Sequence, residues 1–280
     1  MMEKAAIMNE KKSAGYEKLI KGLLVVSAIA LGLGSIFIVS YLFGDGLKAV
    51  FSNYWVLRFV HQLIEAIIGL ALIFIYRKQK ALRCSAEGLK EGLICGAAWL
   101  TMLLIALADL FLNQMTESGL KFISWWEIAL LILQCALIGL FEEGVFRGIA
   151  TELSFELFGT DTKKNAKLAI AFTSFLFGAV HLVNALQPEV SLKAAALQGF
   201  AAFGCGLVYG AIYYRSDRSI WPCVIFHAIQ DFAAFIASGA LRGVTQEEAI
   251  GNTGITQAVS SILFIIWFCY LMREQPEREQ

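Results

Sequence analysis

The sequence has little charge, no cysteine motif and no basic segment, and each absence narrows the possible functions. Charged residues make up 16% of its 280 positions, whereas soluble domains carry about 25%. The net charge is zero and no basic tail or aromatic–basic stripe occurs, which argues against a nucleic-acid partner. The six cysteines are scattered without a CxxC pair, so we expect small buried residues and neither a disulfide framework nor a zinc–cysteine cluster.

Apolar residues are what the sequence has in excess. They make up 58% of the chain, and the mean hydropathy is +0.66, which predicts an all-α polytopic membrane protein. The first apolar run, Gly22 to Phe43, is too long for the core of a signal peptide, so we interpret it as a membrane helix. Because the loops are short, we expect one integral-membrane domain over residues 1–280. The pattern predicts eight transmembrane helices, at roughly 22–43, 54–76, 91–112, 125–147, 167–185, 192–214, 219–240 and 255–272.

The distribution of Lys and Arg predicts the orientation. If the N-terminus is cytoplasmic, 18 of the 23 Lys and Arg fall in inner segments. The excess of positive charge on cytoplasmic loops therefore predicts that the N- and C-termini are both cytoplasmic. This topology makes residues 148–166 a polar inner loop and places Glu142 and His227 about 8–12 Å from the inner face. His181 lies roughly 20 Å along its span from Lys167, which is deeper than Glu142 and His227. Three explanations stay open: the fifth span starts deeper in the membrane than predicted, it is tilted, or the site lies near mid-membrane.

Two further patterns concern helix packing. Arg58, His61 and Glu65 form a polar stripe on the second predicted span, which fits either an interfacial helix start or a helix that lines a wet cavity. Glycines four residues apart predict close helix contacts. They are Gly88, Gly92 and Gly96 near the third span, and Gly206 and Gly210 in the sixth.

The stretch Phe141-Glu142-Glu143-Gly144-Val145-Phe146-Arg147 follows the apolar run Ile128 to Leu140. Each charge in hydrocarbon costs about 2.5–3.5 kcal/mol on insertion scales, so three retained charges mark a functional candidate. Glu143 and Arg147 are four residues apart and share a helix face, whereas Glu142 points about 100° away. We expect Arg147 to neutralise and orient Glu143 and to leave Glu142 free for chemistry. The alternative is an ion pair at a helix end, with Glu142 reaching toward water.

Two of the three histidines lie in late predicted spans. His181 ends the run 172–181, where it is either a packed, hydrogen-bonded side chain or a site residue. His227 and Asp231 are four apart and share a face of the seventh span, where an aspartate is costly unless it has a function. Phe177, one turn before His181, is expected to pack against the imidazole and fix it.

Together, Glu142, His181, His227 and Asp231 carry the groups that hydrolysis needs. A carboxylate can take a proton from water, and imidazoles can share this task, donate to an oxyanion or bind a metal. His181, His227 and Asp231 also suit Zn²⁺ in number and type. No HExxH sequence occurs, so the helix of the soluble zinc proteases is absent.

The spacing of these motifs resembles a known family. Glu-Glu-x-x-x-Arg at 142–147, Phe-x-x-x-His at 177–181 and His-x-x-x-Asn/Asp at 227–231 are similar to the CAAX protease and bacteriocin-processing family of intramembrane proteases, also called CPBP or Abi proteins. The type II CAAX prenyl endopeptidases belong to it, and the resemblance covers about residues 125–240. It implies glutamate-dependent peptide-bond hydrolysis within the membrane. By position, Glu142 would activate water with His181, His227 and Asp231 would stabilise the oxyanion or complete a metal site, and Glu143 and Arg147 would support the site.

The residue at 231 departs from the family's prenyl endopeptidases, which carry Asn there. Asn can donate a hydrogen bond to an oxyanion and ionised Asp cannot, so Asp231 suits a metal ligand or a carboxylate that orients His227. A zinc-dependent and a metal-free mechanism therefore stay as alternatives. We expect a peptide or a lipidated, CAAX-like protein as substrate, in contact with membrane lipid, and a site that opens toward the cytoplasm.

Two other classes of function could use the same fold. A non-proteolytic membrane scaffold or bacteriocin-immunity protein would tolerate the loss of Glu142. A metal transporter would lose metal flux without His227. The joint retention of Glu142, Glu143, Arg147, His181 and His227 favours the enzyme.

Overall fold

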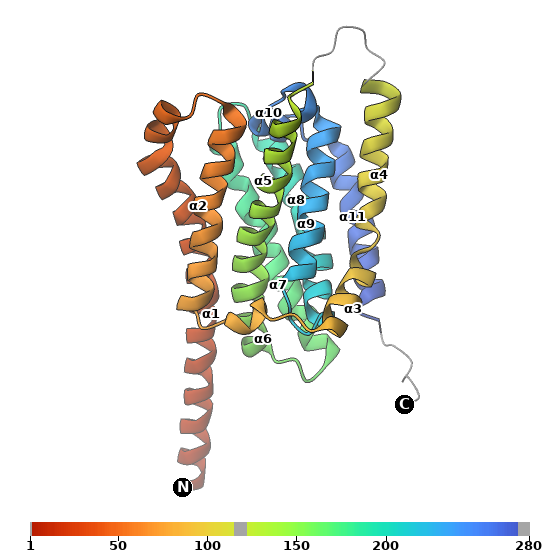
Figure 1. The fold of residues 1–280 in the computed structure, drawn as a ribbon. Helices are drawn as coiled ribbons and strands as arrows, with labels where there is room; N and C mark the ends of the chain where they lie inside the picture. The colour runs from red at the N-terminus through yellow and green to blue at the C-terminus, as the bar shows by residue number, and fades with distance from the viewer. Residues whose placement is uncertain (1, 115–121, 274–280) are drawn as a thin grey trace.

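The computed structural model describes residues 2–114 and 122–273, and within these ranges the chain is helical and contains no strand. The predicted all-α membrane fold is confirmed. The long helices run side by side in one bundle (Figure 1). The α-helices of the described residues, short ones included, are α1 (Met2–Val50), α2 (Tyr54–Ile75), α3 (Ala86–Gly96), α4 (Trp99–Asp109), α5 (Trp125–Glu143), α6 (Glu152–Phe158), α7 (Lys163–Val180), α8 (Leu192–Arg215), α9 (Trp221–Ser238), α10 (Gln246–Gly251) and α11 (Ile255–Leu271).

Polar side chains fix where several helices begin. The Asn53 side chain accepts two backbone N–H bonds at the start of α2, at 3.0 and 3.1 Å. Thr162 and Ser191 each accept one at the starts of α7 and α8, at 3.2 and 3.1 Å. These bonds satisfy backbone donors that a helix start leaves unpaired. Pro222 lies in the first turn of α9, where its missing N–H costs little.

Helix length supports the predicted spans, with two differences. Six of the described helices are long and apolar enough to cross a membrane. The third predicted span is broken, because α3 and α4 meet at a bend of 49°, and this pair counts as one further candidate. The eighth, α11, has 17 residues, against about 20 for a typical crossing. The chain is therefore an integral membrane protein with six or seven candidate spans among the described residues.

Helix α1 begins and α11 ends at the same end of the bundle (Figure 1), which we call the inner end. Helix α5 runs toward this end. The structure contains no membrane, so the cytoplasmic orientation stays a prediction.

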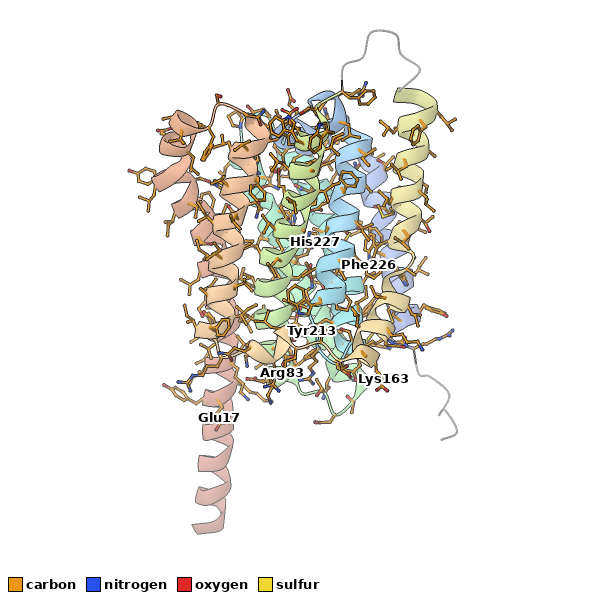
Figure 2. The ribbon with its side chains drawn as sticks, in the orientation of Figure 1. Glu17, Arg83, Lys163, Tyr213, Phe226 and His227 are labelled. Atoms are coloured by element: carbon orange, nitrogen blue, oxygen red, sulfur yellow. The ribbon has the colours of Figure 1, made fainter. Side chains whose placement is uncertain are left out.

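Most of the segment predicted as a polar, partly amphipathic inner loop, 148–166, is helical, and only residues 159–162 lie outside the helices. The chain continues from α5 through the π-helix η3 (Gly144–Thr151) into α6, so the helical segment Trp125–Phe158 has 34 residues. Its acidic residues are paired with neighbouring elements: Tyr213 donates to Glu152 at 2.9 Å, and Lys78 pairs with Glu156. Residue 142 consequently lies midway along this segment, about 25 Å from its start at 1.5 Å per residue. The depth of about 8–12 Å expected for Glu142 stays a prediction. Figure 2 shows His227 near the middle of the bundle.

The glycine patterns do mark close packing. A Cβ on Gly92 would lie 2.5 Å from Pro222 Cγ, and one on Gly96 would lie 2.1 Å from a Phe226 ring carbon. On α8, a Cβ on Gly210 would lie 2.4 Å from Ile170 Cγ2. Contacts this short exclude any larger side chain without a shift of the helices, so α3 packs against α9 and α8 packs against α7.

The polar residues of the stripe on α2 are paired with neighbouring side chains. Arg58 Nη1 lies 3.8 Å from Glu247 Oε1. Deeper in the helix, Glu65 is buried, lies 3.1 Å from His61 Nδ1 and accepts a 2.7 Å bond from Gln62. None of these residues lines either of the two cavities described below. The stripe is a paired network within the helix packing.

Candidate functional site

The seven candidate residues come together from three helical segments. Glu142 and Glu143 end α5 and Arg147 lies in η3, which follows it directly. Phe177 lies in the last turn of α7 and His181 follows that helix. His227 and Asp231 lie on α9.

The π-helix η3 shapes the segment that carries Arg147. All eight of its residues are buried. The Thr151 hydroxyl donates to Phe146 O, five residues earlier, at 2.8 Å and lies 3.0 Å from the Thr173 hydroxyl on α7. These bonds connect η3 to α7, the helix that leads to His181. Short π-helical segments are frequent at functional sites.

Glu143 is the centre of a buried charged network. Its side chain is fully buried, and Oε1 accepts a 3.0 Å bond from Arg147 Nη1, as the spacing predicts. The same oxygen lies 2.7 Å from His227 Nδ1. Because an ionised carboxylate accepts only, Nδ1 of His227 carries the proton in this bond.

Arg147 is held on several sides. Its Nη2 donates to Gly206 O at 3.2 Å. Its guanidinium carbon lies 4.7 Å from the centre of the Phe177 ring and 5.3 Å from that of Tyr209. Stacking on aromatic rings and bonding to a carboxylate compensate a buried guanidinium for lost water. Arg147 therefore supports Glu143 from a fixed position.

His227 presents its second nitrogen to two carboxylates. With Nδ1 bonded to Glu143, Nε2 lies 3.6 Å from Glu142 Oε2 and 3.6 Å from Asp231 Oδ2. The Glu142 and Asp231 side chains are 27% and 21% exposed, whereas that of Glu143 is 0% exposed. The imidazole stacks on Tyr209, with ring centres 5.3 Å apart and planes 2° apart. His227 thus has a dry side fixed by Glu143 and a more open side that faces Glu142 and Asp231.

His181 is fixed by the residue one turn before it. Its Nδ1 lies 2.7 Å from Phe177 O, and its ring packs edge-on against the Phe177 ring, with centres 5.0 Å apart. A carbonyl oxygen accepts only, so Nδ1 carries the proton and Nε2 presents its lone pair. Phe177 therefore orients this imidazole through both its backbone and its ring, which is the packing role predicted for it.

Glu142 and His181 line one cavity of about 40 Å³. By this measure one water needs about 10–15 Å³, so the cavity has room for at least one. Neither His227 nor Asp231 lines it. Glu142 therefore connects two groups of residues: it shares the cavity with His181 and faces His227 Nε2 from the side of α9.

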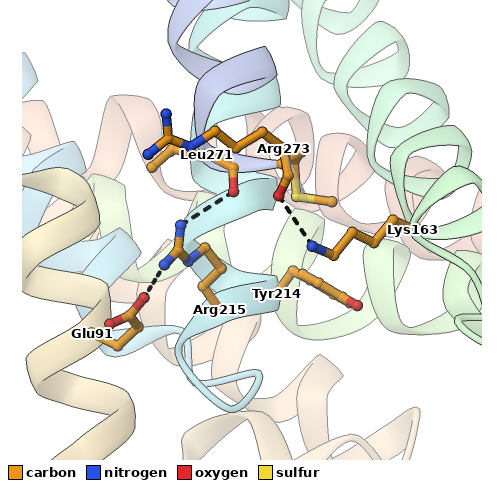
Figure 3. A pocket seen from close by; sticks show the side chains of 7 residues that line it. Glu91, Lys163, Tyr214, Arg215, Leu271 and Arg273 are labelled. Atoms are coloured by element: carbon orange, nitrogen blue, oxygen red, sulfur yellow. Dashed lines mark hydrogen bonds and ion pairs between the residues drawn. The ribbon is translucent and has the colours of Figure 1, made fainter. Parts of the chain in front are cut away.

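A second, larger cavity of about 210 Å³ lies at the inner end and contains none of the candidate residues. Figure 3 shows its polar contacts. Arg215 pairs with Glu91 and donates to Leu271 O at 3.2 Å, and Lys163 donates to Arg273 O at 3.1 Å. Cations on the last carbonyls of a helix satisfy acceptors that the helix leaves unpaired. These contacts fix the end of α11.

The described part of the chain contains no group of side chains arranged as a metal site. Among the residues that the structure describes, no three His, Cys, Asp or Glu side chains are grouped so as to hold a metal ion. His181, His227 and Asp231 are thus not gathered as zinc ligands in this conformation. Zinc dependence stays a prediction, and we derive no step through a metal.

Sequence reasoning missed Tyr209 and the carbonyl of Gly206. Both lie on α8 and contact Arg147 or His227. The sequence pattern identifies Gly206 only as a packing residue. Tyr209 lies three positions later, and its sequence context does not distinguish it from an ordinary core residue. Tyr209 also stacks on Trp99 of α4, with ring centres 5.3 Å apart, so it joins the site to the main apolar core.

The fold and the site define a class: a helical integral membrane protein with a carboxylate–imidazole site inside its bundle. Residues 124–233 match the family model described as type II CAAX prenyl endopeptidase Rce1-like. The matched segment contains all seven candidate residues. This match supports the resemblance to the CAAX protease family that the motifs predict, and that family implies a membrane-bound protease with a peptide or protein substrate. No curated protein matches the chain.

Proposed function

We propose that this protein is an intramembrane endopeptidase that hydrolyses a peptide bond in a membrane-associated or lipidated, CAAX-like substrate. One observation carries the proposal. The Glu142 carboxylate and the His181 imidazole line one cavity that has room for water, while the neighbouring Glu143 is committed to Arg147 and His227. This arrangement leaves a carboxylate and an imidazole lone pair for a nucleophilic water.

The two cavity residues activate the water. Glu142 accepts one proton of the water as general base, and His181 Nε2 accepts a hydrogen bond from the other. The water oxygen then attacks the carbonyl carbon of the scissile bond. Glu142 returns its proton to the leaving nitrogen as the C–N bond breaks, so no other proton donor is required.

His227 stabilises the oxyanion. Its Nδ1–H is engaged by Glu143, and in the protonated imidazole Nε2–H is a donor as well. Three acids, Glu142, Glu143 and Asp231, surround the His227 imidazole, and a protonated His227 balances part of their negative charge. A fixed donor at a site of developing charge is worth about 10²–10³ in rate. Glu143, 2.7 Å from Nδ1, favours this charged form.

A cleavage assay with purified protein tests the proposal. An equimolar peptide library is incubated with wild type, Glu142→Gln and Glu87→Gln, and products are identified by mass spectrometry. Glu87 is an exposed glutamate in the first turn of α3, so Glu87→Gln makes the same chemical change away from the site. We expect cleavage by wild type and Glu87→Gln only.

The alternative is a scaffold or immunity protein of the same fold. If folded wild type cleaves nothing, or if Glu142→Gln cleaves as wild type does, the enzymatic proposal is wrong. Lipidated and unlipidated versions of a cleaved peptide then establish whether the lipid contributes, since a CAAX-like substrate should be cleaved faster in its lipidated form.

A further inference from the structure

Helix α1 forms one wall of the cavity that holds Glu142 and His181. The lining residues from α1 are Ile29, Gly32, Leu33 and Ile36. These positions are spaced i, i+3, i+4 and i+7, which is a single helix face. The wall is therefore a continuous apolar surface placed opposite the two polar residues.

This wall lies outside the segment that matches the family. The match covers residues 124–233, whereas α1 is the first helix of the chain. Helix α1 packs against α2, η3 and α6, and Gly32 approaches Val145 of η3 closely. The position of the wall is thus fixed by packing against the segment that follows the catalytic glutamate.

We propose that this face of α1 determines substrate specificity by binding an apolar side chain that flanks the scissile bond. The inference rests on the proposed function. Apart from Glu142 and His181, all residues that line the cavity are apolar, so a polar side chain would lose hydrogen bonds with water and gain none. A volume of about 40 Å³ is too small for a whole helix or a long hydrocarbon chain, so only a small apolar group can enter beside the nucleophilic water.

Gly32 sets the size of this subsite. A Cβ at position 32 would lie 3.1 Å from Val145 Cγ1, which is closer than an ordinary contact. Val145 also lines the cavity. A methyl group at position 32 therefore either occupies cavity space or pushes Val145 into it, and the subsite shrinks in both cases.

Three variants on α1 test the inference. Gly32→Ala narrows the subsite and Leu33→Ala widens it. Gly34→Ala is the matched control, because it adds the same methyl group two residues away, where nothing lies within 4 Å. Each protein is given peptides that carry Ala, Val, Leu or Phe at the positions flanking the scissile bond, and turnover is measured by mass spectrometry.

The expected result is a change in preference. Gly32→Ala should reduce turnover of the Leu peptide relative to the Ala peptide by about tenfold, the lower end of what one methylene is worth in an apolar pocket. Leu33→Ala should raise turnover of the Phe peptide relative to the Leu peptide by a similar factor. Gly34→Ala should keep the wild-type profile.

Several outcomes overturn the inference. If Gly32→Ala and Leu33→Ala are folded and cleave with the wild-type profile, α1 does not determine specificity, although Glu142-dependent cleavage still stands. If Gly32→Ala does not fold, the test rests on Leu33→Ala: an unchanged ratio of Phe-peptide to Leu-peptide turnover then contradicts the inference. If wild type cleaves no peptide, the proposed function fails and this inference fails with it.

Discussion

His227 Nδ1 lies 2.7 Å from Glu143 Oε1, and this contact separates the roles of two adjacent glutamates. Glu143 is fully buried and shared between Arg147 and His227. Glu142 is 27% exposed, and its nearest charged partner, His227 Nε2, is 3.6 Å away. At 3.6 Å the contact is too long for a hydrogen bond. Glu143 is therefore held by structural contacts, and Glu142 is the carboxylate that we propose as the general base.

The first prediction compares Glu142→Gln with Glu143→Gln. Glu142→Gln should lower turnover by about 10²–10⁴, the usual contribution of a general base, and should leave the melting temperature in detergent near that of wild type. Glu143→Gln should lower the melting temperature, because the amide cannot balance the buried Arg147. Turnover and melting are measured on both proteins. Equal melting losses in the two variants would contradict this division of roles.

A double-variant cycle tests the buried ion pair. Arg147→Ala and Glu143→Ala should each destabilise the protein, since removing one partner of a buried pair costs about 3–5 kcal/mol. The double variant should lose less than the sum of the single losses, because residues in direct contact couple. Melting in detergent is measured for all four proteins.

The same cycle on Lys78 and Glu156 is the control. This pair is more exposed, with the Glu156 side chain 44% exposed, and exposed pairs contribute about 0–1 kcal/mol. Additive losses at Glu143 and Arg147 would mean that they do not interact energetically.

The sequence predicted the parts of the site that depend on local spacing. Glu143 pairs with Arg147 because a helix places residues four apart on one face. The contact of Glu143 with His227 spans 84 positions, and no local pattern carries it. The stacking of Tyr209 on His227 was missed for the same reason.

The helical course of residues 148–158 shows a second limit. Polar residues suggested a loop, but Glu152 and Glu156 are satisfied by Tyr213, Arg218 and Lys78 from distant elements. Composition alone does not distinguish a charged residue that is paired with a distant side chain from one that is exposed to water.

Thr151 is predicted to position the site through the π-helix. Its hydroxyl bonds Phe146 O and lies 3.0 Å from the Thr173 hydroxyl. Thr151→Val keeps the shape but removes both hydroxyl contacts, while Thr173 keeps its bonds to Ala169 O and Ile170 O. The loss of a hydrogen bond costs about 0.5–1.5 kcal/mol. We expect a lower melting temperature and a lower kcat, because η3 and α7 carry Arg147 and lead to His181.

Thr151→Ser retains the hydroxyl and is the control, so it should restore both kcat and most of the stability. A Val variant with reduced stability but wild-type kcat would show that Thr151 is only structural.

Asp231→Asn separates the metal-free mechanism from the zinc-dependent one. In the metal-free mechanism the substitution places an amide donor beside His227 Nε2, now 3.6 Å from Asp231 Oδ2, and turnover should be equal or higher, because an amide N–H can stabilise an oxyanion. With zinc held by His181, His227 and Asp231, the same substitution removes an anionic ligand, and metal content and turnover should fall together. Elemental analysis and peptide turnover are measured on wild type, on Asp231→Asn and on Asp161→Asn, which removes an exposed carboxylate outside the site. Full activity of chelator-treated wild type without bound metal would eliminate zinc. Parallel loss of metal and turnover in Asp231→Asn alone would eliminate the metal-free mechanism.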